Sequence, residues 1–352
     1  MKLSAYQKQF QAAYIQNIRK YKSCPAEVVS LALTYQCQCR CVHCGSVALY
    51  KQEEEKELSY NEITSLIDEI RRLGVNWIDF FGGEPLLVPQ LADYIRHAKE
   101  KGLRVRIDTN GLLLDEEMVK NLKKAGIDLV GVSIDSPFEA VHDRLRGVKG
   151  TFKKAIAGIK YCKKHNVECQ LLTYATKENL KNNDLKKIID LAKSFDIPVR
   201  ILPLVLVGKK MKRKDLALSS QDIALLRNLL EKDKVHWENE FIDSKEVPFF
   251  CTAMHKYFFY ISAYGNVQPC CYFPVSFGNV RQERLEQIIK KMWNSDLFTY
   301  YLDHRRYCCP LEDEAFREKY RILRGTKGPF PKKYKHAHSM NNVNEKEVEV
   351  TS

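Results

Sequence analysis

The alternation of strand-like and helix-like segments is the feature that most limits the fold of this chain. Short runs of β-branched and aromatic residues recur six times between residues 29 and 204, with amphipathic helical segments between them. Six strand-then-helix units favour a parallel sheet with helices outside it. We therefore predict an α/β fold, a partial (β/α)6 TIM-like barrel, with an open α/β sheet as the alternative. The predicted strands cover residues 29–35, 76–83, 103–110, 129–135, 168–176 and 198–204.

The rest of the chain predicts smaller units beside a barrel of residues 25–235. Apolar residues at helical spacing predict an N-terminal helix over residues 1–24. Residues 257–268 contain a Gly-Asn turn and predict a β-hairpin. This hairpin would belong to a small C-terminal α+β cysteine-rich domain over residues 240–324. The polar residues 325–352 are expected to form a flexible tail.

Three cysteines that follow the first predicted strand, Cys37, Cys41 and Cys44, have the spacing C-x3-C-x2-C. The sequence has no apolar run long enough to span a membrane and no signal peptide, so we expect a cytoplasmic protein whose clustered thiols bind metal. Thiolates suit iron–sulfur clusters or zinc, and three of them would leave one iron of a [4Fe–4S] cluster open. A zinc knuckle with Cys39 or His43 as fourth ligand is the alternative. We expect Cys39 itself to point away from its neighbours.

The cysteine spacing occurs together with three other stretches, in the same order as in a known family. These are FFGGEPLL at residues 80–87, then IDTNG, then VSIDSPFEAVHDRLRG. Over about residues 25–205 the chain resembles the radical S-adenosylmethionine (SAM) enzymes. The resemblance implies a [4Fe–4S] cluster whose open iron binds SAM. It also implies reductive cleavage of SAM to a 5′-deoxyadenosyl radical that abstracts hydrogen from a substrate.

The resemblance further implies which residues contact SAM. Glycines at the end of the second strand would let the backbone approach the methionine amino group, and Glu84 would accept hydrogen bonds there. Arg146 would pair with the SAM carboxylate, with a surface salt bridge as the alternative. Short polar side chains at strand ends suit the ribose and the methionine, with loop capping as the alternative, and His43 would pack near adenine. The implied residues are His43, Gly82, Gly83, Glu84, Pro85, Thr109, Asn110, Ser133, Asp135 and Arg146.

A second cysteine group lies in the C-terminal part, where Cys251 and Cys270 belong to a C-x13-G-x4-C pattern. This pattern resembles the opening of the SPASM domain, or of its shortened "twitch" form, which carries auxiliary clusters in a radical SAM subgroup. The resemblance implies one auxiliary iron–sulfur cluster, a [4Fe–4S] cluster, held by these two residues and by one or both of Cys308 and Cys309. Cys271 is a weaker candidate because adjacent side chains diverge. A small zinc site is the alternative.

The implied reaction is the oxidative modification of a substrate, because an auxiliary cluster can accept a second electron. We expect a small molecule such as a sugar, an aminocyclitol or a cofactor precursor. Many peptide-modifying members of the resembled family carry a domain that binds the leader of the peptide, and the about 25 residues before the first strand are too few for one. Modification of a peptide or protein side chain remains the alternative. A non-catalytic iron–sulfur or zinc-binding regulatory protein is an alternative of another class.

The expected partners follow from charge and from the resemblance. The net charge is +13, and residues 208–214 carry five basic side chains after the sixth strand, which would suit an anionic substrate, with a solvated charge run as the alternative. Reduced flavodoxin or ferredoxin would donate the electron. We expect neither a membrane nor, in the absence of an RNA-binding motif, nucleic acid as a partner. The catalytic base is not identified; Tyr174, Lys177 and Glu178 are candidates for facing the substrate.

Overall fold

The computed structural model describes residues 26–45, 55–202, 204, 216–231, 233–238, 251–303, 309–311, 313–320 and 332–333. The predicted N-terminal helix, nearly all of the predicted tail, the basic segment 208–214 and Cys308 lie outside these residues. Within the part that the structure describes, no helix is both long enough and apolar enough to cross a bilayer.

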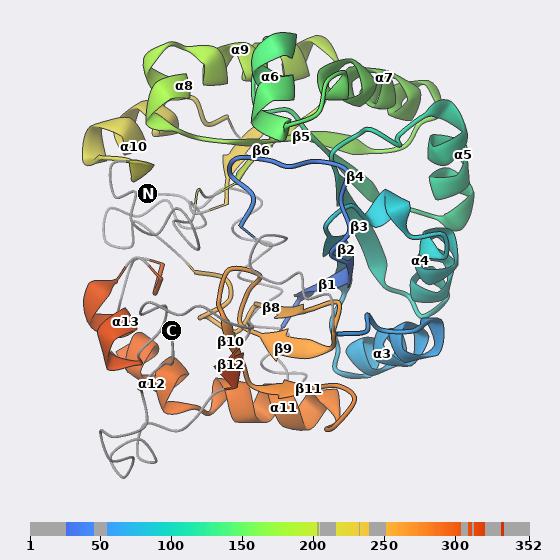
Figure 1. Cartoon of the computed structure of the whole chain (residues 1–352), viewed down its shortest axis with the longest axis vertical. Coiled ribbons are helices and arrows are strands. Elements are labelled where there is room, and N and C mark those ends of the chain that lie inside the picture. Colours follow the sequence, from blue (N-terminus) through green and yellow to red (C-terminus); the bar gives the residue numbers. More distant parts are fainter. Residues whose placement is uncertain are drawn as a thin grey trace, which may run out of the picture.

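Six parallel strands and the helices between them form the predicted partial barrel, which confirms the α/β fold (Figure 1). Each strand pairs in parallel with the next, and the helices form an outer ring around them. The strands are β1 (Val28–Thr34), β2 (Trp77–Gly82), β3 (Arg104–Thr109), β4 (Leu129–Ser133), β5 (Cys169–Tyr174) and β6 (Val199–Leu202). The helices are α3 (Tyr60–Arg72), α4 (Leu91–Glu100), α5 (Glu116–Ala125), α6 (Glu139–Arg146), α7 (Thr151–Lys164), α8 (Lys177–Lys181) and α9 (Asp184–Ser194), with a 3-10 turn η1 (Pro85–Leu87).

The sheet continues beyond the six predicted strands at both edges. After α10 (Ser220–Arg227), strand β7 (Val235–Trp237) adds in parallel to β6. At the other edge, β8 (Phe258–Ile261) adds in parallel to β1 and forms the expected hairpin with β9 (Asn266–Gln268). With β11 (Gly278–Asn279) the sheet has ten strands. The two predicted domains therefore share one sheet, although the sequence predicts a separate hairpin.

The C-terminal part packs three helices beside its end of this sheet (Figure 1). Strand β10 (Val275–Ser276) pairs in parallel with β12 (Lys332–Lys333) in a separate two-stranded sheet. The helices are α11 (Leu285–Trp293), α12 (Asp296–Asp303) and α13 (Glu314–Lys319).

Alternation along the strands separates an apolar layer from a polar lumen. In β3, Val105 and Ile107 are fully buried in the core beneath the helices. Arg106 and Asp108, on the opposite face of the same strand, line the cavity inside the barrel. On the outer layer, the capping box of Ser59 and Glu62 begins α3, as the sequence predicts. This division leaves the interior of the barrel free for a site.

Candidate functional site

A cavity of about 500 Å³ occupies the barrel interior and brings the two cysteine groups together. Its walls include the loop after β1, the carboxyl ends of β2 to β5, and the segment around Cys270. Of the ten residues predicted to contact SAM, eight line it, whereas Glu84 and Pro85 are buried beside it and do not. Those eight are His43, Gly82, Gly83, Thr109, Asn110, Ser133, Asp135 and Arg146.

The loop after β1 carries Cys37, Cys39, Cys41 and Cys44 on one wall of the cavity. Its backbone is bonded to the end of α6, since Arg40 N donates to the carbonyl oxygen of Arg146 at 2.9 Å. The expectation that Cys39 points away is wrong: its thiol is hydrogen-bonded to those of Cys37 and Cys41. The loop turns after β1, so the side chains no longer alternate as they would in a strand.

Two thiols of this loop, those of Cys37 and Cys41, are in surroundings that favour the thiolate. The hydrogen bond from Cys39 is the main cause that lowers the pKa of Cys37 and of Cys41 to about 7. Asn110 Nδ2 donates to Cys37 Sγ at 3.8 Å, and Arg146 Nη1 donates to Cys41 Sγ at 3.8 Å. Sulfur ligands with nearby donors fit an iron–sulfur cluster, whose potential such hydrogen bonds tune.

The two glycines that end β2 allow close contact with the backbone leading into this loop. A Cβ on Gly82 would lie 2.1 Å from the carbonyl oxygen of Thr34, and one on Gly83 would lie 2.1 Å from that of Gln36. Gly83 N also donates to the Thr34 carbonyl at 2.7 Å. The glycines therefore fix the direction of the cysteine loop, in addition to any contact with a ligand.

Glu84 joins the ends of β2 and β3 and is fully enclosed. It accepts hydrogen bonds from Thr109 Oγ1 at 2.6 Å, from Asn110 N at 2.8 Å and from Leu86 N at 3.2 Å. Burial raises the pKa of its carboxyl to about 7, although these bonds act in the opposite direction. With these three donors already bonded, Glu84 acts in the structure as a positioning residue for Thr109 and Asn110.

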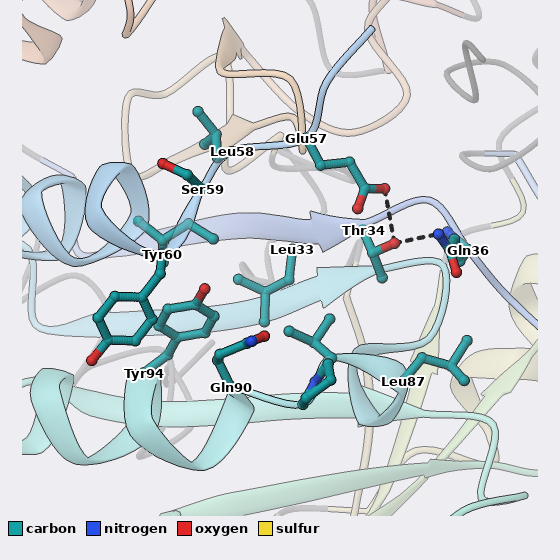
Figure 2. Close-up of a pocket in the computed structure, with 13 residues that line it drawn as sticks. Leu33, Thr34, Gln36, Glu57, Leu58, Ser59, Tyr60, Leu87, Gln90 and Tyr94 are labelled. Atoms are coloured by element: carbon teal, nitrogen blue, oxygen red, sulfur yellow. Dashed lines mark hydrogen bonds between the residues drawn. The ribbon is translucent and has the colours of Figure 1, made fainter. Parts of the chain in front are cut away.

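A second, smaller hollow of about 350 Å³ lies between the end of β1 and the starts of α3 and α4 (Figure 2). Glu57 accepts hydrogen bonds there from Thr34 Oγ1 and from Tyr35 N, both at 2.8 Å. At the other end, the rings of Tyr60 and Tyr94 stack with centroids 5.4 Å apart. Glu57 thus contacts the last residue of β1 and the residue after it, and these bonds stabilise the backbone that leads into the cysteine loop.

A buried ion pair lies against the cysteine loop at the wall of the cavity. Arg146 Nε lies 2.6 Å from Asp135 Oδ2, and His43 Nε2 lies 3.4 Å from the same oxygen. Burial alone would raise the pKa of Asp135, but Arg146, His43 and His142 hold it below its usual range. The ring of His43 lies 4.8 Å from that of Tyr174. Arg146 thus forms a salt bridge, but a buried one and not the surface pair considered for it, because only 9% of its side chain is exposed.

Sequence reasoning missed His142, which holds the backbone at Asp135. Asp135 N donates to His142 Nδ1 at 3.1 Å, and this histidine is completely buried in α6. Burial lowers the pKa of His142 to about 4, so the ring is neutral at neutral pH and its Nδ1 can accept. His142 stands in a run of three polar residues after Val141, and the sequence gave no means of separating it from the exposed Arg144 of the same run.

The second cysteine group reaches the same cavity from the C-terminal part. Cys251, Cys270, Cys271 and Cys309 all line it. Tyr272, beside them, is hydrogen-bonded to Tyr174 at the end of β5. Lys177 and Glu178, which were candidates for facing the substrate, are instead exposed in the first turn of α8. The structure thus brings thiols from both cysteine groups to one cavity.

Comparison with protein families identifies the barrel. The family model described as the radical SAM superfamily matches residues 31–209, just over half of the chain. The chain belongs to the radical SAM superfamily. A second model, described as an iron–sulfur cluster-binding domain and named SPASM, matches residues 251–313. This radical SAM protein is therefore an enzyme that uses SAM and iron–sulfur clusters.

Curated relatives and a solved structure are similar to this radical SAM enzyme. Fe-coproporphyrin III synthase of Methanosarcina barkeri is 37% identical over 212 residues, which cover 59% of this chain and 52% of that protein. The chain thus spans about half the length of this relative. AdoMet-dependent heme synthase of the same organism is 27% identical over 307 residues, 77% of this chain and 83% of that protein.

The fold is similar to that of SuiB from Streptococcus suis bound to S-adenosylmethionine. The TM-score is 0.62 at 17% identity, over 82% of this chain and 70% of that chain. SuiB has also been solved with its precursor peptide SuiA. At this identity the likeness shows the fold alone.

Proposed function

We propose that this radical SAM enzyme oxidatively modifies a small molecule, with cofactor precursors as the first class to test. The curated relatives support this class, since their names describe synthases of Fe-coproporphyrin III and of heme. The alternative of a peptide substrate is supported by solved structures such as SuiB and anSMEcpe with bound peptides, whose likeness is one of fold.

The observation that carries the proposal is the single cavity shared by both cysteine groups. We assign Cys37, Cys41 and Cys44 to the SAM-binding cluster, with Cys39 beside them. We assign Cys251, Cys270 and one or both of Cys308 and Cys309 to the auxiliary cluster. When bound, SAM and the first cluster supply a radical that removes a hydrogen atom from an unactivated carbon.

The side chains around the cavity would hold SAM and exclude water. Arg146 would present its guanidinium to the SAM carboxylate, while Asp135 fixes its orientation from the other side. His43, held between Asp135 and Tyr174, offers an aromatic face for adenine. Thr109 and Asn110, positioned by Glu84, offer polar groups to the methionine end. A reduced flavodoxin or ferredoxin would supply the electron.

Anaerobic reconstitution tests the proposal. We expect about eight iron atoms per chain for two four-iron clusters, and release of 5′-deoxyadenosine when dithionite and SAM are added. Fe-coproporphyrin III and related tetrapyrroles are the first substrates to supply, followed by short peptides. Zinc in place of iron, with SAM intact, would contradict the enzyme assignment, and modification of a peptide alone would move the substrate class to peptides.

A further inference from the structure

The floor of the cavity carries an alternating chain of charged side chains that the sequence analysis did not single out. Asp79 on β2 contacts Arg106 on β3 in an ion pair. Asp108 Oδ2 lies 3.2 Å from Arg200 Nη2, and Arg200 Nε lies 2.6 Å from Glu238 Oε1. A fourth, longer contact of 3.9 Å joins Arg106 Nε to Asp108 Oδ1. Each guanidinium is therefore held between two carboxylates.

The net charge of these side chains at the cavity floor does not favour an anionic ligand. Three carboxylates and two guanidiniums sum to −1, or to zero if Asp79 is protonated, and burial does raise the pKa of Asp79. His236 adds no positive charge, because burial lowers its pKa to about 4. The remaining ion pair that lines the cavity, Asp135 with Arg146, is balanced. An anionic group at this floor would meet cations that carboxylates already occupy.

Buried polar atoms at the floor nevertheless point to a ligand. Gln170 and Asp79 are 4% and 7% exposed, and neither Gln170 Nε2 nor Asp79 Oδ1 has a hydrogen-bond partner among the described residues. Leaving such atoms without a partner destabilises the folded protein. Both residues line the cavity, so a bound group can satisfy them. One of these atoms donates and the other accepts.

Gly131 allows the Asp108 carboxylate to lie against the backbone of β4. It pairs in register with Asp108 on one side and with Gln170 on the other. A Cβ at this position would lie 2.4 Å from Asp108 Oδ1 and 2.8 Å from Leu172 Cδ1, so any side chain here would displace both groups. The glycine therefore lets the acceptor on β3 and the donor on β5 line the cavity with no side chain from this position between them.

We propose that this floor is the polar end of the substrate site and that it binds an uncharged amide group. The amide carbonyl would accept from Gln170, and the amide N–H groups would donate to the oxygens of Asp79 and Asp108. A carboxylate of the same size has no N–H to donate and would face the two carboxylates instead. This inference rests on the proposed function and deepens it, because it replaces the expected anionic substrate at this end of the site.

The test compares two probes of one size in the reconstituted holoenzyme with SAM and dithionite: carbon-deuterated propionamide and carbon-deuterated propionate. A probe bound at the floor lies in the same cavity as the residues proposed to hold SAM. The 5′-deoxyadenosyl radical can therefore abstract deuterium from it, and the label then appears in 5′-deoxyadenosine. We expect transfer from propionamide to exceed that from propionate by about tenfold, the effect of one or two hydrogen bonds. Equal transfer, or more from propionate, would overturn the inference.

Matched variants on one strand connect the result to the floor. Gln170→Leu removes the donor and is expected to reduce about tenfold the deuterium transferred from propionamide per 5′-deoxyadenosine released. Thr173→Val changes a buried hydroxyl without a bonding partner in the described chain, on the face away from the cavity, and is expected to leave transfer unchanged. Equal losses in both variants would contradict a specific role for Gln170.

A crystal soaked with propionamide separates this inference from the proposed function. Density for the amide between Gln170 and Asp108 would support the subsite even if the enzyme cleaved no SAM. The absence of SAM cleavage would contradict only the proposed function. Active enzyme that gives neither transfer nor density would overturn the subsite and leave the function intact. Deuterated acetyl-alanine amide is a third probe. If more deuterium is transferred from it than from propionamide, the floor still binds an amide, but the substrate is a peptide.

Discussion

The hydroxyl groups of Tyr35 and Tyr260 lie 2.6 Å apart and are completely enclosed. Tyr35 is two residues before Cys37, and Tyr260 lies on β8 of the C-terminal part. This hydrogen bond therefore joins the two cysteine-bearing regions directly. Burial raises the pKa of Tyr35, so its hydroxyl remains protonated.

We expect Tyr35→Phe and Tyr260→Phe each to lower the free energy of unfolding by about 1–2 kcal/mol, because each leaves a buried hydroxyl with one bond fewer. The double variant should lose less than the sum, since the second change removes the group left unsatisfied. Urea unfolding of the four proteins measures this coupling. Strict additivity would show that the two hydroxyls do not interact.

Gly83→Ala tests how the cysteine loop is positioned. The added Cβ would lie 2.1 Å from the Gln36 carbonyl oxygen, so the loop must move. We expect the variant to lose about four iron atoms per chain, those of the first cluster, and to cleave no SAM. Iron analysis measures this, with Gly102→Ala as the control: nothing lies within 4 Å of its added Cβ, and the strain of its φ of 78° is confined to the turn before β3, at the end of that strand away from the cysteines. Full iron content in Gly83→Ala would argue against the steric explanation.

Arg146→Lys keeps the charge but removes the guanidinium fork. The present side chain reaches Asp135 through Nε and Cys41 through Nη1, and one ammonium group cannot reproduce both contacts. We expect at least about a tenfold fall in 5′-deoxyadenosine release, with iron content retained. Arg144→Lys, at an exposed position of the same helix, should have no effect. An unchanged rate in Arg146→Lys would remove this residue from the SAM site.

Two cysteine variants separate the proposed clusters. Cys41→Ala should abolish SAM cleavage. Cys270→Ala should retain some cleavage but stop product formation, because its thiol belongs to the second group. Paired assays of 5′-deoxyadenosine and product measure both steps, and Cys162→Ala, buried in the core away from the cavity, serves as the control. If Cys270→Ala made product at the normal rate, the auxiliary cluster would have no part in catalysis.

The ion pair of Glu62 with Arg281 gives stability that depends on pH. The pKa of Glu62 is lowered from 4.5 to about 2, mainly because Glu62 accepts a hydrogen bond from Arg281. A lowered carboxyl pKa stabilises the folded state above about pH 4.5, and this contribution is lost as the pH falls towards 2. Wild type should therefore be more stable than Arg281→Gln at pH 7, with the difference shrinking over this range.

Urea unfolding of both proteins from pH 7 to pH 2.5 checks this dependence. Loss of clusters in acid affects both proteins alike, so their difference isolates the ion pair. Arg284→Gln, an exposed change three residues away, is the control and should follow wild type. A difference between wild type and Arg281→Gln that stays constant with pH would assign the effect to packing alone.

The strands and helices of the barrel could be predicted because their signals are local. Residues 103–110 predict a strand, and β3 covers Arg104–Thr109. Ser59 and Glu62 predict the start of α3 through a capping box that the structure contains. These features depend on side-chain periodicity and on hydrogen bonds between residues close in sequence.

The same strand contained a signal for the lumen that the sequence analysis did not use. Arg106 and Asp108 alternate with Val105 and Ile107, which already indicates charged residues on the inner face. Their ion-pair partners, Asp79 and Arg200, lie on β2 and β6, and no local pattern connects them. The sequence therefore indicated the charged inner face of β3 but not the partners of its charged residues.

The sequence by itself determined the order of strands and helices, the spacing of the first cysteine group, and the family motifs, since all of these lie within short segments. Only the tertiary structure decided that β8 joins the edge of β1, that Cys39 contacts its neighbours, and that Gln170 faces Asp108 across Gly131. The physical reason is that pairing between distant segments depends on which strand edges and side-chain faces meet in three dimensions, and a local pattern does not specify that partner.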